Sequence, residues 1–166
     1  LQTDDVDTPL KIYSKARQIQ GRYGLDMIVI DHMHLMSGGR KGDEKNRVQE
    51  LSYISRQLKL MAKEFDIPVI ALAQLSRAVE GRQDKRPQLS DLRDSGSIEQ
   101  DADLVLMMYR EAYYNERVKD DLVELAVKKF RNGALGTVNL EFCKEMSRFT
   151  VVPFGGRHVD EKDLPI

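Results

Sequence analysis

Two short apolar runs on either side of one long amphipathic helix constrain the fold of this chain more than any other feature. The runs cover residues 25–31 and 69–74, and between them apolar side chains recur at helical spacing from Glu44 to Phe65. Short strands without polar alternation are typical of parallel sheets that are buried on both faces. A strand, a helix and a second strand in this order predict a right-handed βαβ unit.

Further helices and strands are predicted on both sides of this unit. Thr8 and Pro9 are typical of a helix start, with a hydroxyl at the N-cap and proline in the first turn. Downstream, Asn132 and Gly133 separate two apolar runs and are a strong signal for a β-hairpin. The sequence thus predicts an α/β fold with a mostly parallel sheet flanked by helices and with antiparallel strands at the C-terminal end. The strands expected in the second half span residues 104–109, 122–130, 137–142 and 149–152.

Composition limits the class of protein and its compartment. The chain has 166 residues and a formal net charge of −1, so a nucleic-acid interface would have to depend on local patches. The single Cys143 excludes an internal disulfide framework and fits a reducing compartment, and no run approaches the roughly 20 apolar residues that cross a bilayer. We expect a soluble, cytoplasmic protein with one domain over residues 1–154 and a polar tail over 155–166. Because the chain begins at Leu1, we expect a fragment of a longer protein.

Two predicted strands end in a polar residue. Asp31 follows four apolar residues, the pattern of a Walker B strand, whose carboxylate holds Mg²⁺ in nucleotide hydrolases. Gln74 closes the next strand and could orient a water or sense a phosphate. The alternative readings are ordinary ones: Asp31 could cap the following turn, and Gln74 could be a strand-end residue without a catalytic role.

Two further groups of residues have the chemistry to bind phosphates. Lys129 and Arg131 alternate along a strand, so period-two geometry places both cations on one face, where they could reach a phosphate on a neighbouring subunit. Arg93, Asp94 and Gly96 lie in a loop whose glycine would permit close approach to a nucleic-acid backbone. A solvated hairpin tip and a surface turn are the respective alternatives.

Several common catalytic patterns are missing from the sequence. His32 and His34 follow Asp31 closely, but no convincing third ligand stands nearby, which argues against a metal centre of this kind. A P-loop requires Gly-x-x-x-x-Gly-Lys-Ser/Thr, and the sequence contains no Gly-Lys dipeptide. It also lacks a Gly-x-Ser-x-Gly elbow and a paired-cysteine zinc pattern. The chain as it stands is not expected to cradle a triphosphate.

In their order along the chain, these motifs closely resemble the DnaB-family replicative helicases. The resemblance covers roughly Leu1 to Val152, and its most specific part is the run from Arg82 to Asp103. It implies a RecA-like ATPase domain from a ring-shaped hexamer that unwinds duplex DNA at replication forks. The segments that carry it are residues 28–31, 35–36, 69–77, 82–87, 90–103, 129–133 and 136–138.

The resemblance also implies roles for individual residues in using ATP and Mg²⁺. Asp31 would be the Walker B carboxylate, coordinating Mg²⁺ through water. Gln74 would couple the state of the nucleotide to the loops that contact DNA. Arg131 would be the arginine finger and Lys129 its companion, both acting on the nucleotide of the neighbouring subunit.

The same resemblance implies binding partners and a missing part. Arg93, Asp94 and Gly96 would hold the backbone of single-stranded DNA in the central channel, and primase and a helicase loader would be partners of the nucleoid-associated hexamer. The P-loop lies upstream in this family, so the chain alone should be inactive as an ATPase, with unpaired strand edges and exposed apolar faces. A recombinase-like or clock-type RecA relative is a second hypothesis, against which the Arg82–Asp103 run argues. A catalytically inactive RecA-like module that binds DNA or a subunit is the alternative from another class.

Overall fold

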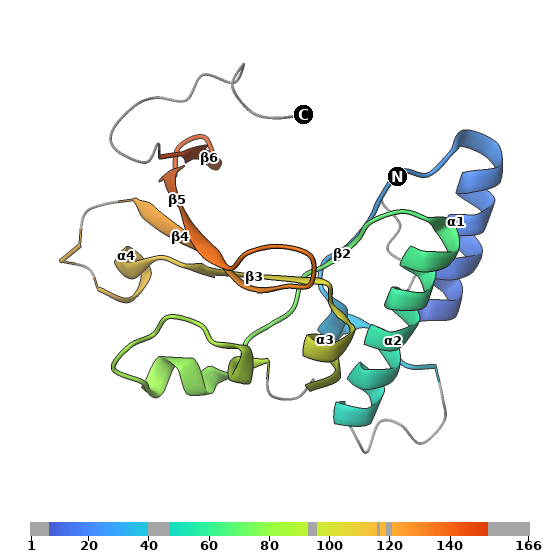
Figure 1. Cartoon of the computed structure of the whole chain (residues 1–166), viewed down its shortest axis with the longest axis horizontal. Helices are drawn as coiled ribbons and strands as arrows, with labels where there is room; N and C mark the ends of the chain where they lie inside the picture. Colours follow the sequence, from blue (N-terminus) through green and yellow to red (C-terminus); the bar gives the residue numbers. More distant parts are fainter. Residues whose placement is uncertain (1–6, 40–46, 93–95, 116, 119–120, 153–166) are drawn as a thin grey trace. The chain divides into compact units, whose positions relative to one another are not determined.

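The chain divides into two compact units in the computed structural model (Figure 1). The structure describes residues 7–39, 47–92, 96–115, 117–118 and 121–152. The first unit, called here the helical unit, consists of Leu1–Ala78 and Leu89–Ala102. The second, called the sheet unit, consists of Val79–Gln88 and Asp103–Ile166. The chain therefore leaves the helical unit after Ala78, returns to it at Leu89, and leaves it again after Ala102.

The helical unit contains the predicted βαβ arrangement. Strands β1 and β2 pair in parallel, with Ile28 opposite Val69 and Ile30 opposite Ala71. The predicted helix start is also confirmed, because the Thr8 hydroxyl accepts a hydrogen bond from the Lys11 backbone amide at 3.3 Å. The elements of this unit are α1 (Pro9–Tyr23), β1 (Ile28–Ile30), η1 (Met33–Leu35), α2 (Arg47–Phe65), β2 (Val69–Ala71), η4 (Leu89–Asp91) and α3 (Gly96–Asp101).

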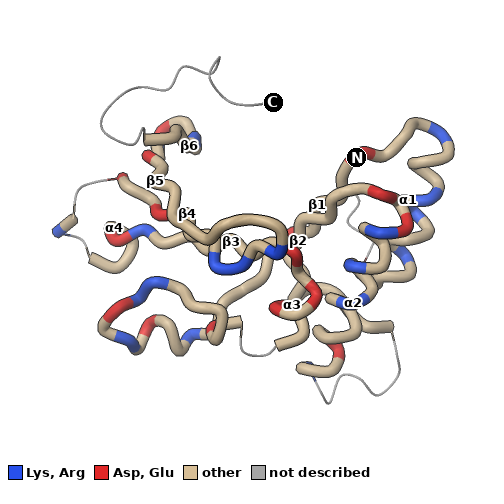
Figure 2. The backbone as a smooth tube through the Cα atoms, in the orientation of Figure 1, with Lys and Arg blue, Asp and Glu red and all other residues tan. Residues whose placement is uncertain are grey.

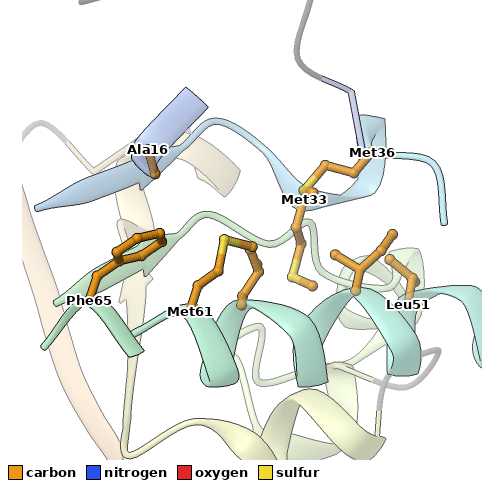
Figure 3. Packing of buried hydrophobic residues seen from close by; sticks show 8 residues of the cluster. Ala16, Met33, Met36, Leu51, Met61 and Phe65 are labelled. Atoms are coloured by element: carbon orange, nitrogen blue, oxygen red, sulfur yellow. The ribbon is translucent and has the colours of Figure 1, made fainter. Parts of the chain in front are cut away.

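The core of the helical unit forms between α2 and the loop that follows β1. Met33 and Met36 from that loop point toward the apolar face of α2, as Figure 3 shows. Each large apolar side chain buried in this way contributes about 1.5–3 kcal/mol to folding. The α2 residues in this core are those predicted from helical spacing, except for the exposed Val48: Leu51, Ile54, Leu58, Met61 and Phe65.

The prediction that these strands are buried on both faces is wrong. Ile28, Ile30 and Val69 pack against the core, but Val29 is 57% exposed and Ile70 is 47% exposed. Side chains alternate between the two faces of a strand, and in the described part of the chain helices cover one face of this pair. Both faces of this strand pair therefore carry apolar side chains, but only one face is covered by other residues that the structure describes.

The sheet unit is an antiparallel sheet in the order β3-β4-β5-β6. The hairpin predicted at Asn132 and Gly133 joins β4 to β5, and the fold class expected from the sequence is confirmed. A β-bulge lies between β3 and β4, because Val105 pairs with Lys129 whereas Leu106 pairs with Val127. The elements are β3 (Leu104–Tyr109), α4 (Glu111–Tyr114), β4 (Leu122–Phe130), β5 (Gly136–Cys143) and β6 (Arg148–Val151), and a short turn of 3-10 helix, η3 (Arg77–Gly81), spans the junction between the units.

The two faces of β3 differ in burial. Val105 and Met107 are buried, whereas Leu104, Leu106 and Met108 are about half exposed. Apolar residues are thus exposed on strands of both units. Among the residues that the structure describes, no helix is both long enough and apolar enough to cross a membrane.

Candidate functional site

Asp31 and Gln74 lie at the same edge of the parallel pair. Asp31 directly follows β1 and is exposed, and the hydrogen-bond ladder continues past it, with Leu72 donating to the Ile30 carbonyl at 2.9 Å and Met33 donating to the Leu72 carbonyl at 3.0 Å. Gln74 follows β2 by three residues. The carboxyl ends of neighbouring parallel strands are where open α/β sheets bind their ligands. The structure therefore brings together the two strand-end residues predicted for nucleotide chemistry.

His34 connects the two strand ends. The backbone amide of Gln74 donates a hydrogen bond to Nδ1 of His34 at 3.2 Å. From the sequence, His34 was considered only as a metal ligand. The described residues contain no group of three His, Cys, Asp or Glu side chains that could hold a metal. The arrangement could have been anticipated from the parallel pairing, which places the residues after β1 next to those after β2.

An ion pair between buried Glu50 and partly exposed Arg47 holds the loop that follows Asp31. Glu50 on α2 is 5% exposed; it accepts a hydrogen bond from the Gly38 amide at 2.7 Å and another from Arg47. Arg47 also donates to the carbonyls of His34 at 2.7 Å and Met36 at 3.2 Å. The Gly38 amide is the main reason that the pKa of Glu50 is lowered; burial opposes it, and Arg47 adds to the lowering.

Glu50 was not predicted from the sequence, although its position in the helix carries a signal. Glu50 stands four residues before Ile54 and therefore lies on the apolar face of α2. A carboxylate on a buried helix face requires hydrogen-bond donors from a neighbouring segment. Here one donor is the Gly38 amide of the loop between β1 and α2, and the other is Arg47 of α2, which also binds two carbonyls of that loop. The pair therefore fixes the path of the chain just beyond Asp31.

The predicted DNA-binding loop is described only at its end. Arg93 and Asp94 lie outside the described residues, and Gly96 is the exposed first residue of α3. Helix α3 packs against α2 in the helical unit. The position of Gly96 is thus set by how α3 is attached to α2.

Hydroxyl and carboxylate groups attach α3 to α2 at both of its ends. Ser97 donates a hydrogen bond to the Ser52 hydroxyl at 2.8 Å, and Ser55 donates to the Asp101 carboxylate at 2.9 Å. Arg56 lies 3.5 Å from the same carboxylate. Because buried Ser55 supplies one of these contacts, α3 is held at a defined place on the α2 surface.

The predicted cations of the β-hairpin lie at one end of β4, in the sheet unit. Lys129 pairs with Val105 across the sheet, and Arg131 directly follows the last residue of β4. Arg131 Nη1 lies 3.3 Å from a carboxylate oxygen of Asp103. Asp31 and Gln74 belong to the helical unit, so each unit by itself contains only part of the predicted set.

The segment Val79–Gln88 is fastened to the sheet by Arg86. The Arg86 guanidinium donates two hydrogen bonds to the Glu124 carboxylate on β4 and lies 4.7 Å from the centre of the Tyr109 ring. Alternating red and blue along this part of the chain in Figure 2 shows how closely opposite charges follow one another there. The Glu124 hydrogen bonds raise the pKa of Arg86, and burial raises the pKa of Tyr109. The pairing of Arg86 with Glu124 was not predicted from the sequence.

The residues at the strand ends fit a magnesium ion that is held through water. Mg²⁺ keeps several of its waters in protein sites and takes one or two carboxylates together with substrate phosphates. Asp31 supplies one exposed carboxylate at the edge of the parallel pair. When bound with a nucleotide, the ion would neutralise charge on the phosphates. Asp31 would orient one of its waters.

Comparison with known proteins identifies relatives over nearly all of this chain. The protein family described as "DnaB-like helicase C terminal domain" matches residues 2–151 of this chain. The chain is 50% identical to the replicative DNA helicase DnaB of Geobacillus stearothermophilus over 155 residues, which are 93% of this chain and 33% of that protein. It is 48% identical to the replicative DNA helicase DnaC of Bacillus subtilis over 165 residues, which are 96% of this chain and 35% of that protein. The chain thus spans about a third of the length of these curated relatives.

Solved structures show the same similarity in three dimensions. One solved ATPase domain superimposes with a TM-score of 0.80 at 44% identity, covering 86% of this chain and 51% of that one. A DnaB-like replicative helicase, studied together with its interactions with primase, also superimposes with a TM-score of 0.80, at 45% identity, covering 86% of this chain and 35% of that one. The RecA-like fold expected from the sequence is confirmed by these neighbours.

Proposed function

The chain belongs to the family of DnaB-like helicase C-terminal domains, and on that premise we propose that it is part of a hexameric helicase that couples ATP hydrolysis to movement along single-stranded DNA and to duplex unwinding. Residues 1–154 would form part of the ATPase domain and residues 155–166 a tail. The observation that carries the proposal is the meeting of Asp31 and Gln74 at one edge of the parallel pair, in a chain about half identical to replicative helicases.

Asp31 and Gln74 would act on the nucleotide bound to the same subunit. An exposed carboxylate directly after β1 suits water-mediated contact with Mg²⁺, and a side-chain amide three residues beyond β2 suits sensing of the terminal phosphate. The His34 hydrogen bond to the Gln74 amide would carry a shift at one strand end to the other. Gln74 could in this way pass the state of the nucleotide to the segment that leads to α3.

Arg131 and Lys129 would act on the nucleotide of the neighbouring subunit. A finger arginine contributes about 10³–10⁵ to the rate in related nucleotide hydrolases. Supplying it from a neighbour makes hydrolysis depend on assembly of the ring. Arg131 is exposed and lies beyond the end of β4, which supports this role because an exposed guanidinium is accessible to a neighbouring subunit.

Arg93, Asp94 and Gly96 would contact the DNA backbone. Contacts to phosphates carry no sequence information, as unwinding of any duplex requires. A primase is named with one solved relative, and we extend primase and a helicase loader to this protein as partners. Action at replication forks would place the protein in the cytoplasm, at the nucleoid.

The proposal predicts that this chain needs residues that its sequence lacks. Because it contains no Gly-Lys dipeptide, we expect it alone neither to bind ATP tightly nor to hydrolyse it. The test is binding of a fluorescent ATP analogue with Mg²⁺ to this chain and to a chain extended upstream through a P-loop. Tight binding by the extended chain alone, lost on Asp31→Ala, supports the proposal. Tight binding by the short chain contradicts it, and binding by neither favours a module that acts on DNA or a subunit without hydrolysis.

A further inference from the structure

Asp103 contacts Arg131 at two points. The backbone amide of Arg131 donates a hydrogen bond to the Asp103 carbonyl at 2.8 Å, and Nη1 of Arg131 lies 3.3 Å from Oδ1 of Asp103. Both residues belong to the sheet unit. The last pair of the β3–β4 ladder is Leu104 with Phe130, so Asp103 and Arg131 form the next pair outward. The ladder thus sets the backbone of Arg131, and the carboxylate sets the direction of its side chain.

The contact contributes more to orientation than to stability. The two side chains are 52% and 54% exposed, and exposed ion pairs contribute only about 0–1 kcal/mol to folding. An arginine that stabilises a phosphoryl group must instead present its guanidinium in a narrow range of positions, and misplacement of a reacting group by about 1 Å can cost about 10²-fold in rate. A carboxylate opposite Arg131 restricts the rotamers from which its guanidinium can leave the sheet.

We propose that Asp103 is a positioning residue for Arg131, which it orients toward the nucleotide of the neighbouring subunit. The inference rests on the proposed function, since it requires Arg131 to act across the subunit interface. It assigns no contact between Asp103 and the nucleotide. Asp103→Asn is the informative variant, because it keeps the backbone carbonyl and the side-chain size and replaces the charged carboxylate with a neutral amide.

The first test is steady-state ATP hydrolysis by the full-length ring in the presence of single-stranded DNA. We expect Asp103→Asn to lower kcat by about 10- to 100-fold with little change in KM, because only the transition state loses an interaction. Asp103→Glu should recover part of kcat. Glu141→Gln, which removes an exposed carboxylate from β5 of the same sheet, is the matched control and should keep kcat. A normal kcat for Asp103→Asn, or an equal loss in Glu141→Gln, overturns the inference.

A mixed-ring experiment separates this inference from the proposed function. Rings that mix Asp103→Asn subunits with Asp31→Ala subunits contain interfaces where one subunit supplies an intact Asp31 and its neighbour supplies an Arg131 that is still paired with Asp103. We expect such rings to hydrolyse ATP faster than either variant alone, as rings that mix Arg131→Ala with Asp31→Ala should also do. Recovery with Arg131→Ala but not with Asp103→Asn refutes the positioning role and leaves the proposed function standing. Recovery with neither refutes the trans-acting arginine and the inference with it.

Discussion

Two hydrogen bonds join the guanidinium of Arg86 to the carboxylate of Glu124, one of 2.8 Å from Nε to Oε2 and one of 2.6 Å from Nη2 to Oε1. This fork-to-fork geometry is the strongest way in which an arginine binds a carboxylate. The Tyr109 ring lies under the same guanidinium. These contacts fix the segment Val79–Gln88, which contains little regular structure, to β4.

Replacing Arg86 with lysine should loosen the segment Val79–Gln88 although the charge is kept. An ammonium group cannot form the two parallel hydrogen bonds, and it stacks less well on the Tyr109 ring. We expect the segment to lose about 1 kcal/mol of local stability, a value kept small because Arg86 is partly exposed. Amide hydrogen exchange across residues 79–88 measures the effect.

Lys85→Arg is the matched control for this prediction. Lys85 lies in the same segment, 4.9 Å from the centre of the Tyr114 ring, and arginine preserves both its charge and its ring contact. Exchange in residues 79–88 should stay unchanged in this variant. Equal protection in Arg86→Lys and the wild type would show that the Glu124 pair does not hold the segment.

The buried carboxylate of Glu50 should make the helical unit sensitive to acid. Its pKa in the folded protein is lowered from an ordinary value of 4.5, so the unfolded chain binds the proton first. The stability that Glu50 contributes is therefore complete above pH 4.5 and is lost as the pH falls through the lowered pKa. In Glu50→Gln we expect about 1–3 kcal/mol lower stability at pH 7, because a buried hydrogen-bond network loses its charge, and a weaker dependence on acid.

Urea unfolding at neutral pH and at pH 4 checks this expectation. Asp26→Asn, in which an exposed carboxylate of the same unit is neutralised, serves as the comparison and should follow the wild type at both pH values. The interpretation of the Glu50 pair fails if Glu50→Gln is as stable as Asp26→Asn at pH 7.

Replacing His34 with alanine should free the backbone amide of Gln74. A neutral hydrogen bond contributes about 0.5–1.5 kcal/mol, which corresponds to roughly two- to tenfold faster hydrogen exchange at that amide. His32→Ala is the control, since it removes the neighbouring imidazole and keeps the acceptor of the Gln74 amide. Exchange at Gln74 that is equally slow in both variants would contradict the link between the strand ends.

Alanine at position 133 should displace Phe130. A Cβ atom on Gly133 would lie 2.2 Å from Cε1 and 2.4 Å from Cδ1 of the Phe130 ring, well inside contact distance. The ring is partly exposed and can swing away, so we expect a cost of about 1 kcal/mol and a shift in the backbone that carries Lys129 and Arg131.

Amide chemical shifts of residues 129–131 report this displacement. The comparison is Gly136→Ala, at the start of β5, where an added Cβ atom meets no other atom within 4 Å. Gly136→Ala should leave these shifts in place. Unchanged shifts in Gly133→Ala would mean that the turn absorbs the methyl group without moving the ring.

Local sequence signals predicted the elements that local physics determines. The Thr8 cap, the apolar face of α2 and the turn at Gly133 each depend on residues close together in the chain, and all three are present in the structure. The burial of β1 was predicted wrongly, because an apolar sequence shows that a strand can be buried on both faces but not that other segments cover both faces. Whether a neighbour covers Val29 depends on other segments.

The contacts that organise the candidate site join residues far apart in the sequence. Arg86 and Glu124 are separated by 38 positions, and the amide of Gln74 by 40 positions from His34. The spacing of residues within one segment cannot predict such a long-range contact, because each partner taken alone resembles an ordinary surface residue. Glu50 is the exception, because a carboxylate among the apolar positions of α2 already indicates a buried partner.

The sheet unit is assembled from two separate stretches of chain, and this limits how the protein can be divided. Its strands begin after Asp103, but buried Val79 and Pro87 come from an earlier stretch, on the far side of α3 in the sequence. A single cut just before Asp103 would remove these apolar residues and leave Glu124 without its guanidinium. We therefore expect an excised sheet unit to fold only when residues 79–88 are joined to it by an artificial linker. A protease that cuts once between Gln88 and Asp103 should release the two stretches only after the sheet unit has unfolded.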